Sequence, residues 1–235
     1  MFERQQEDSR VARQLLAYFV DGAYKGIVQI DYRYTRTAKS SVFDIYTRIQ
    51  GRDYHVTRHS FFGAIADLLD QLPVTSAVML PHRIVILRNG KDEDIATLEE
   101  WLYPYEDRRI GDTVVYQLKL LVGDSSIETP RRTEHGYLVT DFGNAAEHLR
   151  KLLGDTIRLK ICYFCRYLAE YNDYGGTDYR HDQLYCFRDS PDVLDELMKT
   201  YPILRGRESL LARGTPDMDA LHSCAAFTYR ETPRP

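Results

Sequence analysis

The segment most informative about the fold class is Ser41–Ile49, which has the sequence SVFDIYTRI. Apolar and polar side chains alternate along it, and this period of two is typical of a strand with one buried face. The buried face would carry Phe43, Ile45 and Ile49. Gln50–Asp53 comes next with a glycine and polar residues, which predicts a turn into a second strand.

An amphipathic helix is expected after this pair of strands, and a similar helix occurs later in the chain. Ser60–Leu72 has apolar residues at helical spacing and ends before Pro73. Asp141–Leu153, offset by 81 residues, has Phe142, Ala145, Leu149 and Leu153 where the first helix has Phe61, Ala64, Leu68 and Leu72. The pattern suggests two ββαβ units. Helical periodicity alone produces similar matches, so a duplication and a chance likeness both stay open.

Further segments complete a prediction of the α+β class. We predict helices at Asp8–Val20, Lys91–Trp101 and Ser190–Lys199, and strands at Tyr24–Tyr34, Val74–Leu80, Arg83–Arg88, Val114–Val122 and Thr156–Ile161. Asn89-Gly90 is a strong signal for a tight turn directly after Arg88. We expect these elements to form a mixed or antiparallel sheet with packed helices.

The composition excludes several classes of protein. The chain has 235 residues, of which 43% are hydrophobic, and its formal net charge is only -4. A disordered chain has fewer apolar residues and a larger net charge, and a broadly basic nucleic-acid binder has the opposite sign of charge. No apolar stretch suits a membrane span, and Met1–Asp8 is polar, unlike a secretory signal. We therefore expect a cytoplasmic protein with no membrane partner.

Four cysteines lie in the last third of the chain, at Cys162, Cys165, Cys186 and Cys224. Zn²⁺ takes four thiolates tetrahedrally, and a Cys-x-x-Cys turn presents two of them to one ion. A redox dithiol and four unrelated buried cysteines are the alternatives. A strand runs into the first pair and an apolar segment carries the third, so we favour a structural zinc site.

We expect all four cysteines to bind the zinc ion. His222 and His181 are alternatives to Cys224 as the fourth ligand. The predicted organisation is an α+β domain over residues 1–155 and a zinc-stapled C-terminal module over residues 156–235.

The last 75 or so residues resemble an uncharacterised bacterial protein family. The resemblance rests on Cys162-Tyr163-Phe164-Cys165, a loop rich in Tyr, Asp and Gly, Cys186-Phe187-Arg188 and a late cysteine. It implies a metal-bound, zinc-ribbon-like C-terminal module and no particular activity. The chain departs from the family pattern after Cys224, where no acidic residue follows closely.

No catalytic motif accompanies the cysteines. The chain has no phosphate-binding glycine loop, no Gly-x-Ser-x-Gly and no His-Glu-x-x-His. The His-x-Glu that zinc deaminases pair with Cys-x-x-Cys is also missing upstream of Cys162. The polar loop 171–182 brings acidic, basic and tyrosine side chains together in one short stretch. Its candidate binding residues are Tyr171, Tyr174, Asp178, Tyr179, Arg180 and His181.

The expected function is that of a non-catalytic zinc-binding protein that acts by binding another protein. Tyrosine and arginine, which are enriched at protein interfaces, are abundant in and around the polar loop. An immunity or accessory factor would fit such a role. The alternatives are an enzyme that uses loop 171–182 and a nucleic-acid-binding protein that uses the short basic clusters Arg131-Arg132 and Arg205–Arg207.

Overall fold

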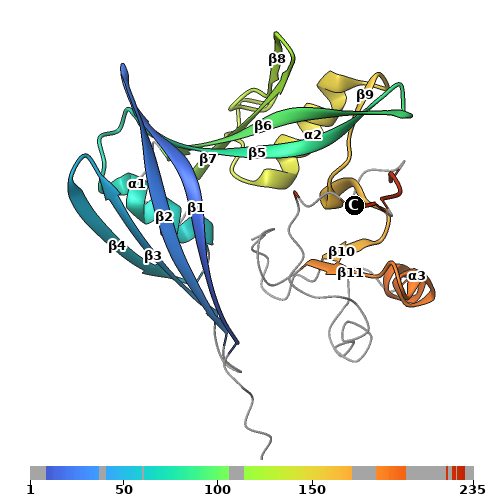
Figure 1. Cartoon of the computed structure of the whole chain (residues 1–235), viewed down its shortest axis with the longest axis horizontal. Coiled ribbons are helices and arrows are strands. Elements are labelled where there is room, and N and C mark those ends of the chain that lie inside the picture. Colours follow the sequence, from blue (N-terminus) through green and yellow to red (C-terminus); the bar gives the residue numbers. More distant parts are fainter. Residues whose placement is uncertain are drawn as a thin grey trace, which may run out of the picture. The chain divides into compact units, whose positions relative to one another are not determined.

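The first part of the chain forms four strands that pair antiparallel in chain order (Figure 1). The computed structural model describes residues 9–36, 41–59, 61–105, 114–170, 184–199, 221, 224–225 and 227–230. The four strands are β1 (Ser9–Asp21), β2 (Tyr24–Arg36), β3 (Ser41–Ile49) and β4 (Arg52–Arg58). The strands predicted at Ser41–Ile49 and Tyr24–Tyr34 are confirmed.

The predicted helix over Asp8–Val20 is wrong, because Ser9–Asp21 is strand β1. Apolar residues spaced by four positions fall on one face of a helix, but they also fall on one face of a strand because four is even. Strand pairing decides between the two: Leu15 lies opposite Ile30 and Phe19 opposite Gly26.

Helix α1 (Phe61–Asp70) packs against β3 and β4. Its buried residues Ala64, Ile65, Leu68 and Leu69 have at most 1% of their surface exposed. Phe43 and Ile45 of β3 are likewise fully buried. The alternation of β3 and the helical period of α1 therefore supply one hydrophobic core, and the predicted helix is confirmed.

A second set of four strands extends the sheet. These strands are β5 (Ser76–Arg88), β6 (Asp92–Pro104), β7 (Val114–Val122) and β8 (Ser125–Glu128). The hydrogen-bonded order is β4-β3-β2-β1-β5-β6-β7-β8. The strand predicted at Val114–Val122 is confirmed, whereas the two predicted at Val74–Leu80 and Arg83–Arg88 form the single strand β5.

The predicted helix over Lys91–Trp101 is also wrong, because this segment belongs to strand β6. Ala96, Leu98, Glu100 and Leu102 are buried, while the residues between them are more exposed. That alternation is the strand period. The preceding turn agrees with it: Asn89 and Gly90 have positive φ values of 50° and 73°, as a two-residue hairpin turn requires.

Helix α2 (Phe142–Leu153) and strand β9 (Ile157–Leu159) come after β8. Helix α2 contacts β8 and β9, and β9 pairs antiparallel with the end of β5. The order strand-strand-helix-strand thus occurs twice, as β3-β4-α1-β5 and as β7-β8-α2-β9. Each occurrence is part of a longer set of four strands and a helix.

The rest of the described chain is made of short elements. These are the 3₁₀ helix η1 (Cys162–Phe164), the paired strands β10 (Leu168–Glu170) and β11 (Leu184–Cys186), and helix α3 (Pro191–Lys199). Phe187 forms a small hydrophobic cluster with Val193, Leu194 and Leu197 of α3. The predicted helix at Ser190–Lys199 is confirmed. The molecule is therefore α+β, with most of its regular structure in antiparallel sheet.

The chain divides into two compact units. Unit 1 contains residues 1–81, 99–119 and 130–141, and unit 2 contains residues 82–98, 120–129 and 142–235. The long strands β5, β6 and β7 each contribute to both units. The domain boundary that we predict between residues 155 and 156 would separate two regions that fold independently, and it stays a prediction. None of the helices in the described ranges is both long and apolar enough to cross a membrane.

Candidate functional site

The first two cysteines lie in a tight turn directly after β9. The Phe164 amide donates to the Ile161 carbonyl at 3.0 Å, and the Cys165 amide donates to the Cys162 carbonyl at 2.9 Å. These bonds close one turn of 3₁₀ helix, so residues three positions apart project to the same side. Cys162 and Cys165 are each only 3% exposed. The Cys-x-x-Cys turn expected from the sequence is therefore present and buried.

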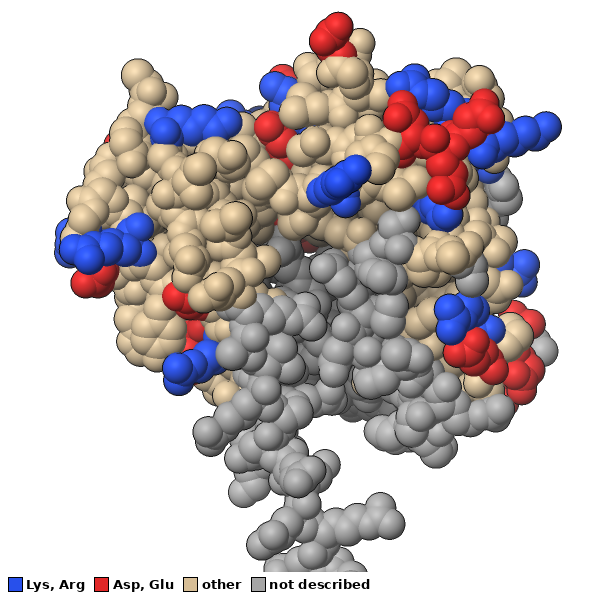
Figure 2. All heavy atoms as spheres, viewed as in Figure 1, with Lys and Arg blue, Asp and Glu red and all other residues tan. Residues whose placement is uncertain are grey.

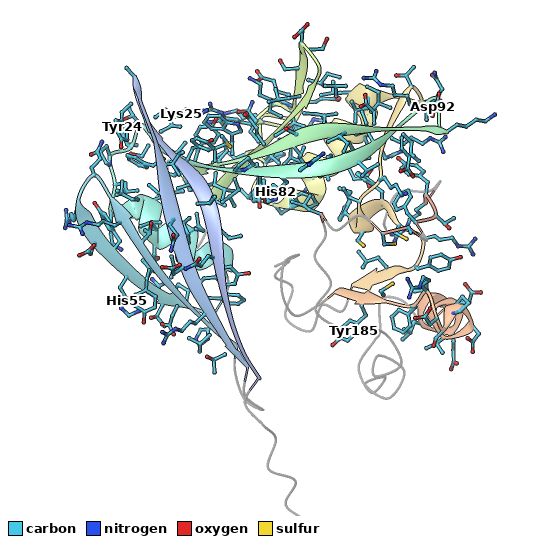
Figure 3. All side chains as sticks on the ribbon, in the orientation of Figure 1. Tyr24, Lys25, His55, His82, Asp92 and Tyr185 are labelled. Carbon is cyan, nitrogen blue, oxygen red and sulfur yellow. The ribbon has the colours of Figure 1, made fainter. Side chains whose placement is uncertain are left out.

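The third cysteine reaches this turn through the β10–β11 pair. Cys186 on β11 is the register partner of Leu168 on β10. The Phe187 amide extends the pairing by donating to the Tyr167 carbonyl at 2.8 Å. Because Leu168 follows Cys165 by three residues, this pairing fixes the backbone of Cys186 beside the turn. Tyr185 projects from the same short strand (Figure 3).

The fourth cysteine belongs to a C-terminal segment that pairs with the turn itself. The Arg166 amide donates to the Thr228 carbonyl at 2.9 Å, and the Arg230 amide donates to the Phe164 carbonyl at 2.8 Å. Cys165 and Tyr229 form an isolated antiparallel bridge between these two bonds. Cys224 lies just before this bridge in the sequence. Three segments far apart in sequence, each carrying cysteine, are thus joined by backbone hydrogen bonds.

The Arg230 side chain strengthens the same junction. One of its terminal guanidinium nitrogens lies 2.7 Å from the Cys165 carbonyl oxygen and 2.9 Å from the Leu168 carbonyl oxygen. A charged donor shared between two carbonyls makes stronger bonds than a neutral amide does. Arg230 therefore holds the end of the turn and the start of β10 together. Sequence patterns do not reveal this residue, because a single arginine near a proline-rich end carries no signal.

Aromatic rings pack the turn against the rest of unit 2. Tyr163 meets both Phe142 and Phe164 edge to face, with ring centroids 5.3 and 5.0 Å apart. Phe164 stacks on Tyr229 at 6.0 Å, and the Arg158 guanidinium lies over the Tyr229 ring at 4.8 Å. Phe142 opens α2, so the helix supports the cysteine turn through these rings.

The sulfur atoms influence one another electrostatically. Burial raises the pKa of the Cys186 thiol, and the backbone N–H of Arg188 opposes this by hydrogen bonding to the sulfur. Negative charge on Cys165 or Cys224 raises the pKa of Cys186 further. All four cysteines have free thiols. As the side chains stand, no three His, Cys, Asp or Glu of the described residues form a group that could hold a metal ion.

The other predicted binding residues are not among those that the structure describes. Tyr171, Tyr174, Asp178, Tyr179, Arg180, His181, the alternative ligand His222 and the basic cluster Arg205–Arg207 all lie outside the described ranges. In the other basic cluster, Arg131 stacks on the Tyr103 ring at 3.6 Å and donates to Gln117 at 3.3 Å. Arg132 donates to the Gly136 carbonyl at 3.0 Å. Both arginines thus have local partners within the protein.

One fully buried carboxylate was not anticipated from the sequence. Glu100 on β6 is 0% exposed and accepts a hydrogen bond from the hydroxyl of Tyr116 on β7, which is equally buried. Each side chain lies between two buried apolar residues on the same face of its strand. The pair cannot touch a substrate without opening the core, and a buried polar group with a partner is the ordinary structural arrangement.

No protein-family model, curated protein or solved structure matches the chain.

Proposed function

We propose that the protein binds one zinc ion through Cys162, Cys165, Cys186 and Cys224, and that it acts by binding another protein rather than by catalysis. The observation that carries the metal proposal is the convergence of three cysteine-bearing segments through main-chain hydrogen bonds. Four free thiols distributed over such a junction match the donor set of a structural zinc site.

Metal binding would require a local rearrangement. Since the thiols do not form a metal-binding group as they stand, their side chains would have to rotate toward a common centre and release their protons. The backbone of the segments is already joined, so the rearrangement is confined to the cysteines and their immediate neighbours. The N–H of Arg188 directed at the Cys186 sulfur would favour the thiolate that zinc needs.

Burial argues for a structural ion and against a redox dithiol. Cys162 and Cys165 are almost fully buried, whereas reactive dithiols lie in partly exposed surroundings that lower a thiol pKa. Four thiolates also fill the tetrahedral shell of zinc and leave no position for an activated water. A closed ion would stabilise unit 2 and perform no chemistry.

The experiment is metal analysis of the purified full chain under reducing conditions. The proposal expects about one zinc per chain, and substitution of any one of the four cysteines by serine should lower zinc content and weaken affinity. His135→Gln removes an exposed histidine of unit 1 and serves as the matched control, with unchanged zinc content. Metal-free protein with four titratable thiols would contradict the proposal.

Protein binding is tested separately. Zinc-loaded and zinc-stripped chain are each used to capture partners from the native host. A partner retained by the loaded form and lost by the stripped form supports a role as a zinc-dependent binding protein. The immunity or accessory role stays a prediction, and an adjacent toxin gene whose product is captured would support it. Turnover of a captured molecule would contradict a non-catalytic role.

A further inference from the structure

The strands β1 to β4 have two unlike faces. On one face, alternate residues such as Ile30, Phe43 and Ile45 are buried, and α1 packs against β3 and β4. On the other face, Leu16 of β1 lies opposite Gln29 of β2, and Tyr46 of β3 lies opposite His55 of β4. Continuing the β2–β3 register by one residue places Gln29 opposite Arg48. We call this second surface the open face. Its described side chains include Leu16, Tyr18, Lys25, Ile27, Gln29, Asp31, Arg33, Asp44, Tyr46, Arg48, Asp53, His55 and Thr57.

Large apolar side chains are exposed on the open face. Leu16 is 67% exposed and Ile27 is 69% exposed, and they are neighbours because Ile27 pairs with Tyr18, two residues after Leu16. Tyr46 is 40% exposed and stacks on His55 with ring centroids 4.3 Å apart. Contiguous exposed apolar side chains are one feature of protein-binding surfaces, and Leu16 and Ile27 form such a contact between neighbouring strands.

The charges of the described side chains on the open face are balanced. Lys25, Arg33 and Arg48 are basic, and Asp31, Asp44 and Asp53 are acidic, so the three positive and three negative groups cancel. Polar partners also lie close together: Arg48 is 3.5 Å from Asp53, and the His55 ring nitrogen Nε2 is 3.4 Å from an Asp44 carboxylate oxygen. In the view of Figure 2, Lys and Arg lie interspersed with Asp and Glu among the described residues. Described side chains without net charge make a poor surface for a polyanion.

We propose that the open face packs against the open face of a second copy of this chain. In a two-fold dimer the same patch of each copy meets the other, so a face that carries both signs of charge in equal number is not repelled by its own copy. Sheets commonly pack face to face at about 10 Å with apolar side chains between them. Leu16 and Ile27 would form the apolar centre of the contact. Tyr46 lies beyond Gln29 and Asp31 from that centre, because it pairs with Asp31, and the charged residues would form paired contacts around it.

The size of the open face suits such a dimer. Four strands at about 4.8 Å spacing and some nine residues at about 3.3 Å each give a projected area of roughly 600 Å². Side chains increase the accessible area beyond this projection, toward the roughly 800 Å² per partner of an ordinary stable interface. The shallow groove lined by Ile27, Tyr46, Arg48 and His55 gives the face relief into which side chains of a partner can fit.

The test is the mass of the full chain in solution, by analytical ultracentrifugation over a range of concentrations. The wild type should show a reversible dimer. Leu16→Glu and Ile27→Glu should each weaken dimerisation at least tenfold, because a carboxylate would be buried at the apolar centre. Val74→Glu is the matched control, since Val74 is 66% exposed in the same unit but lies in the turn between α1 and β5. It should leave the dimer unchanged, and circular dichroism checks that all three variants fold.

Three outcomes would overturn the proposal. The wild type could be a monomer at about 100 μM, or its dimer could survive Leu16→Glu and Ile27→Glu. Val74→Glu could weaken it equally, which would mean a non-specific effect of added charge. The proposal does not depend on zinc.

Discussion

The two sets of four strands and a helix differ in the element that comes after the helix. After α1 the chain enters β5, which is 13 residues long and pairs inside the sheet. After α2 it enters β9, which is 3 residues long and stops at the cysteine turn. The same order of elements thus builds more sheet in the first set and supports the cysteine-bearing segments in the second. Substitutions in each set can test that difference, and those with the strongest effect should be in the two helices.

Loss of core packing should lower the free energy of unfolding by a similar amount in both helices, but it should affect the proposed zinc site in only one of them. Leu68 of α1 and Leu149 of α2 are both 0% exposed, so Leu68→Ala and Leu149→Ala should each lower the free energy of unfolding by about 2–5 kcal/mol. Only Leu149→Ala should speed zinc release, because α2 supports the cysteine turn through Phe142. Urea unfolding and a colorimetric zinc-release assay measure the two effects.

Leu152→Ala is the control for the helix variants. Leu152 lies on α2 but is 54% exposed, so its truncation should change neither measurement appreciably. Faster zinc release in Leu68→Ala as well would show that support of the cysteine turn is not specific to α2.

Removal of the Arg230 side chain should weaken the junction of the cysteine-bearing segments and leave the first set of strands unaffected. Arg230→Ala deletes the bonds to the Cys165 and Leu168 carbonyls and should cost about 2 kcal/mol, since each is a hydrogen bond to a charged donor. We expect weaker zinc binding, measured by competition with a chelator. Arg230→Lys can keep one of the two bonds and should give an intermediate affinity. Identical affinity in all three proteins would contradict the role assigned to Arg230.

The two tight turns should respond differently to asparagine. The β3–β4 turn has Gln50 at φ 49°, whereas the β5–β6 turn has Asn89 at φ 50°. Asparagine tolerates this left-handed region better than glutamine does. Gln50→Asn should therefore raise the unfolding free energy by about 0.5 kcal/mol, and Asn89→Gln should lower it by a similar amount. Thermal unfolding of both variants provides the comparison, and a change of the same sign in both would refute it.

The smallest effect should come from an exposed ion pair beside the β5–β6 turn. The side chain of Arg88 donates to Asp94 at 2.8 and 2.9 Å, and this holds the pKa of Asp94 below its usual value of 3.8. The carboxylate therefore adds stability above pH 3.8, and this stability is lost as the pH falls through the lower pKa of the folded state.

Asp94→Asn should accordingly flatten the pH dependence of the urea midpoint below about pH 4. In a protein that already carries Arg88→Gln, Asp94→Asn should change the pH dependence of the urea midpoint less. The hydrogen bond from Arg88, which is the main cause of the lowered Asp94 pKa, is then already absent. Equal effects in both backgrounds would mean that Arg88 does not set the pKa of Asp94.

The elements with a single possible period were predictable from the sequence. Residues 41–49 place Phe43, Ile45 and Ile49 on one face of a strand, and residues 61–70 have a helical period that no strand would bury. Asp8–Val20 and Lys91–Trp101 were predicted wrongly as helices because their apolar spacings suit both periods locally. In each case the partner strand decided the outcome, and strand pairing is a tertiary property that local periodicity does not contain.

The candidate site was predictable only in part. The Cys-x-x-Cys turn and the returning strand at Cys186 agree with local patterns. Arg230 and Tyr229 could not be identified, because their roles depend on pairing across more than 60 residues with the turn. Glu100 was missed because its segment was predicted as a helix, and because a carboxylate is ordinarily expected on an exposed face.

The two units share β5, β6 and β7, and this sharing affects when each unit can fold during biosynthesis. Unit 1 needs residues up to 141, while unit 2 begins at residue 82, so a ribosome delivers parts of both before either is complete. Domains that are contiguous in sequence can fold one after the other during translation, whereas unit 1 is complete only after residues 82–98 and 120–129 of unit 2 have also been synthesised. Cys224 emerges last of the four cysteines. The proposed ion could therefore join its full ligand set only after nearly all of both units has been synthesised.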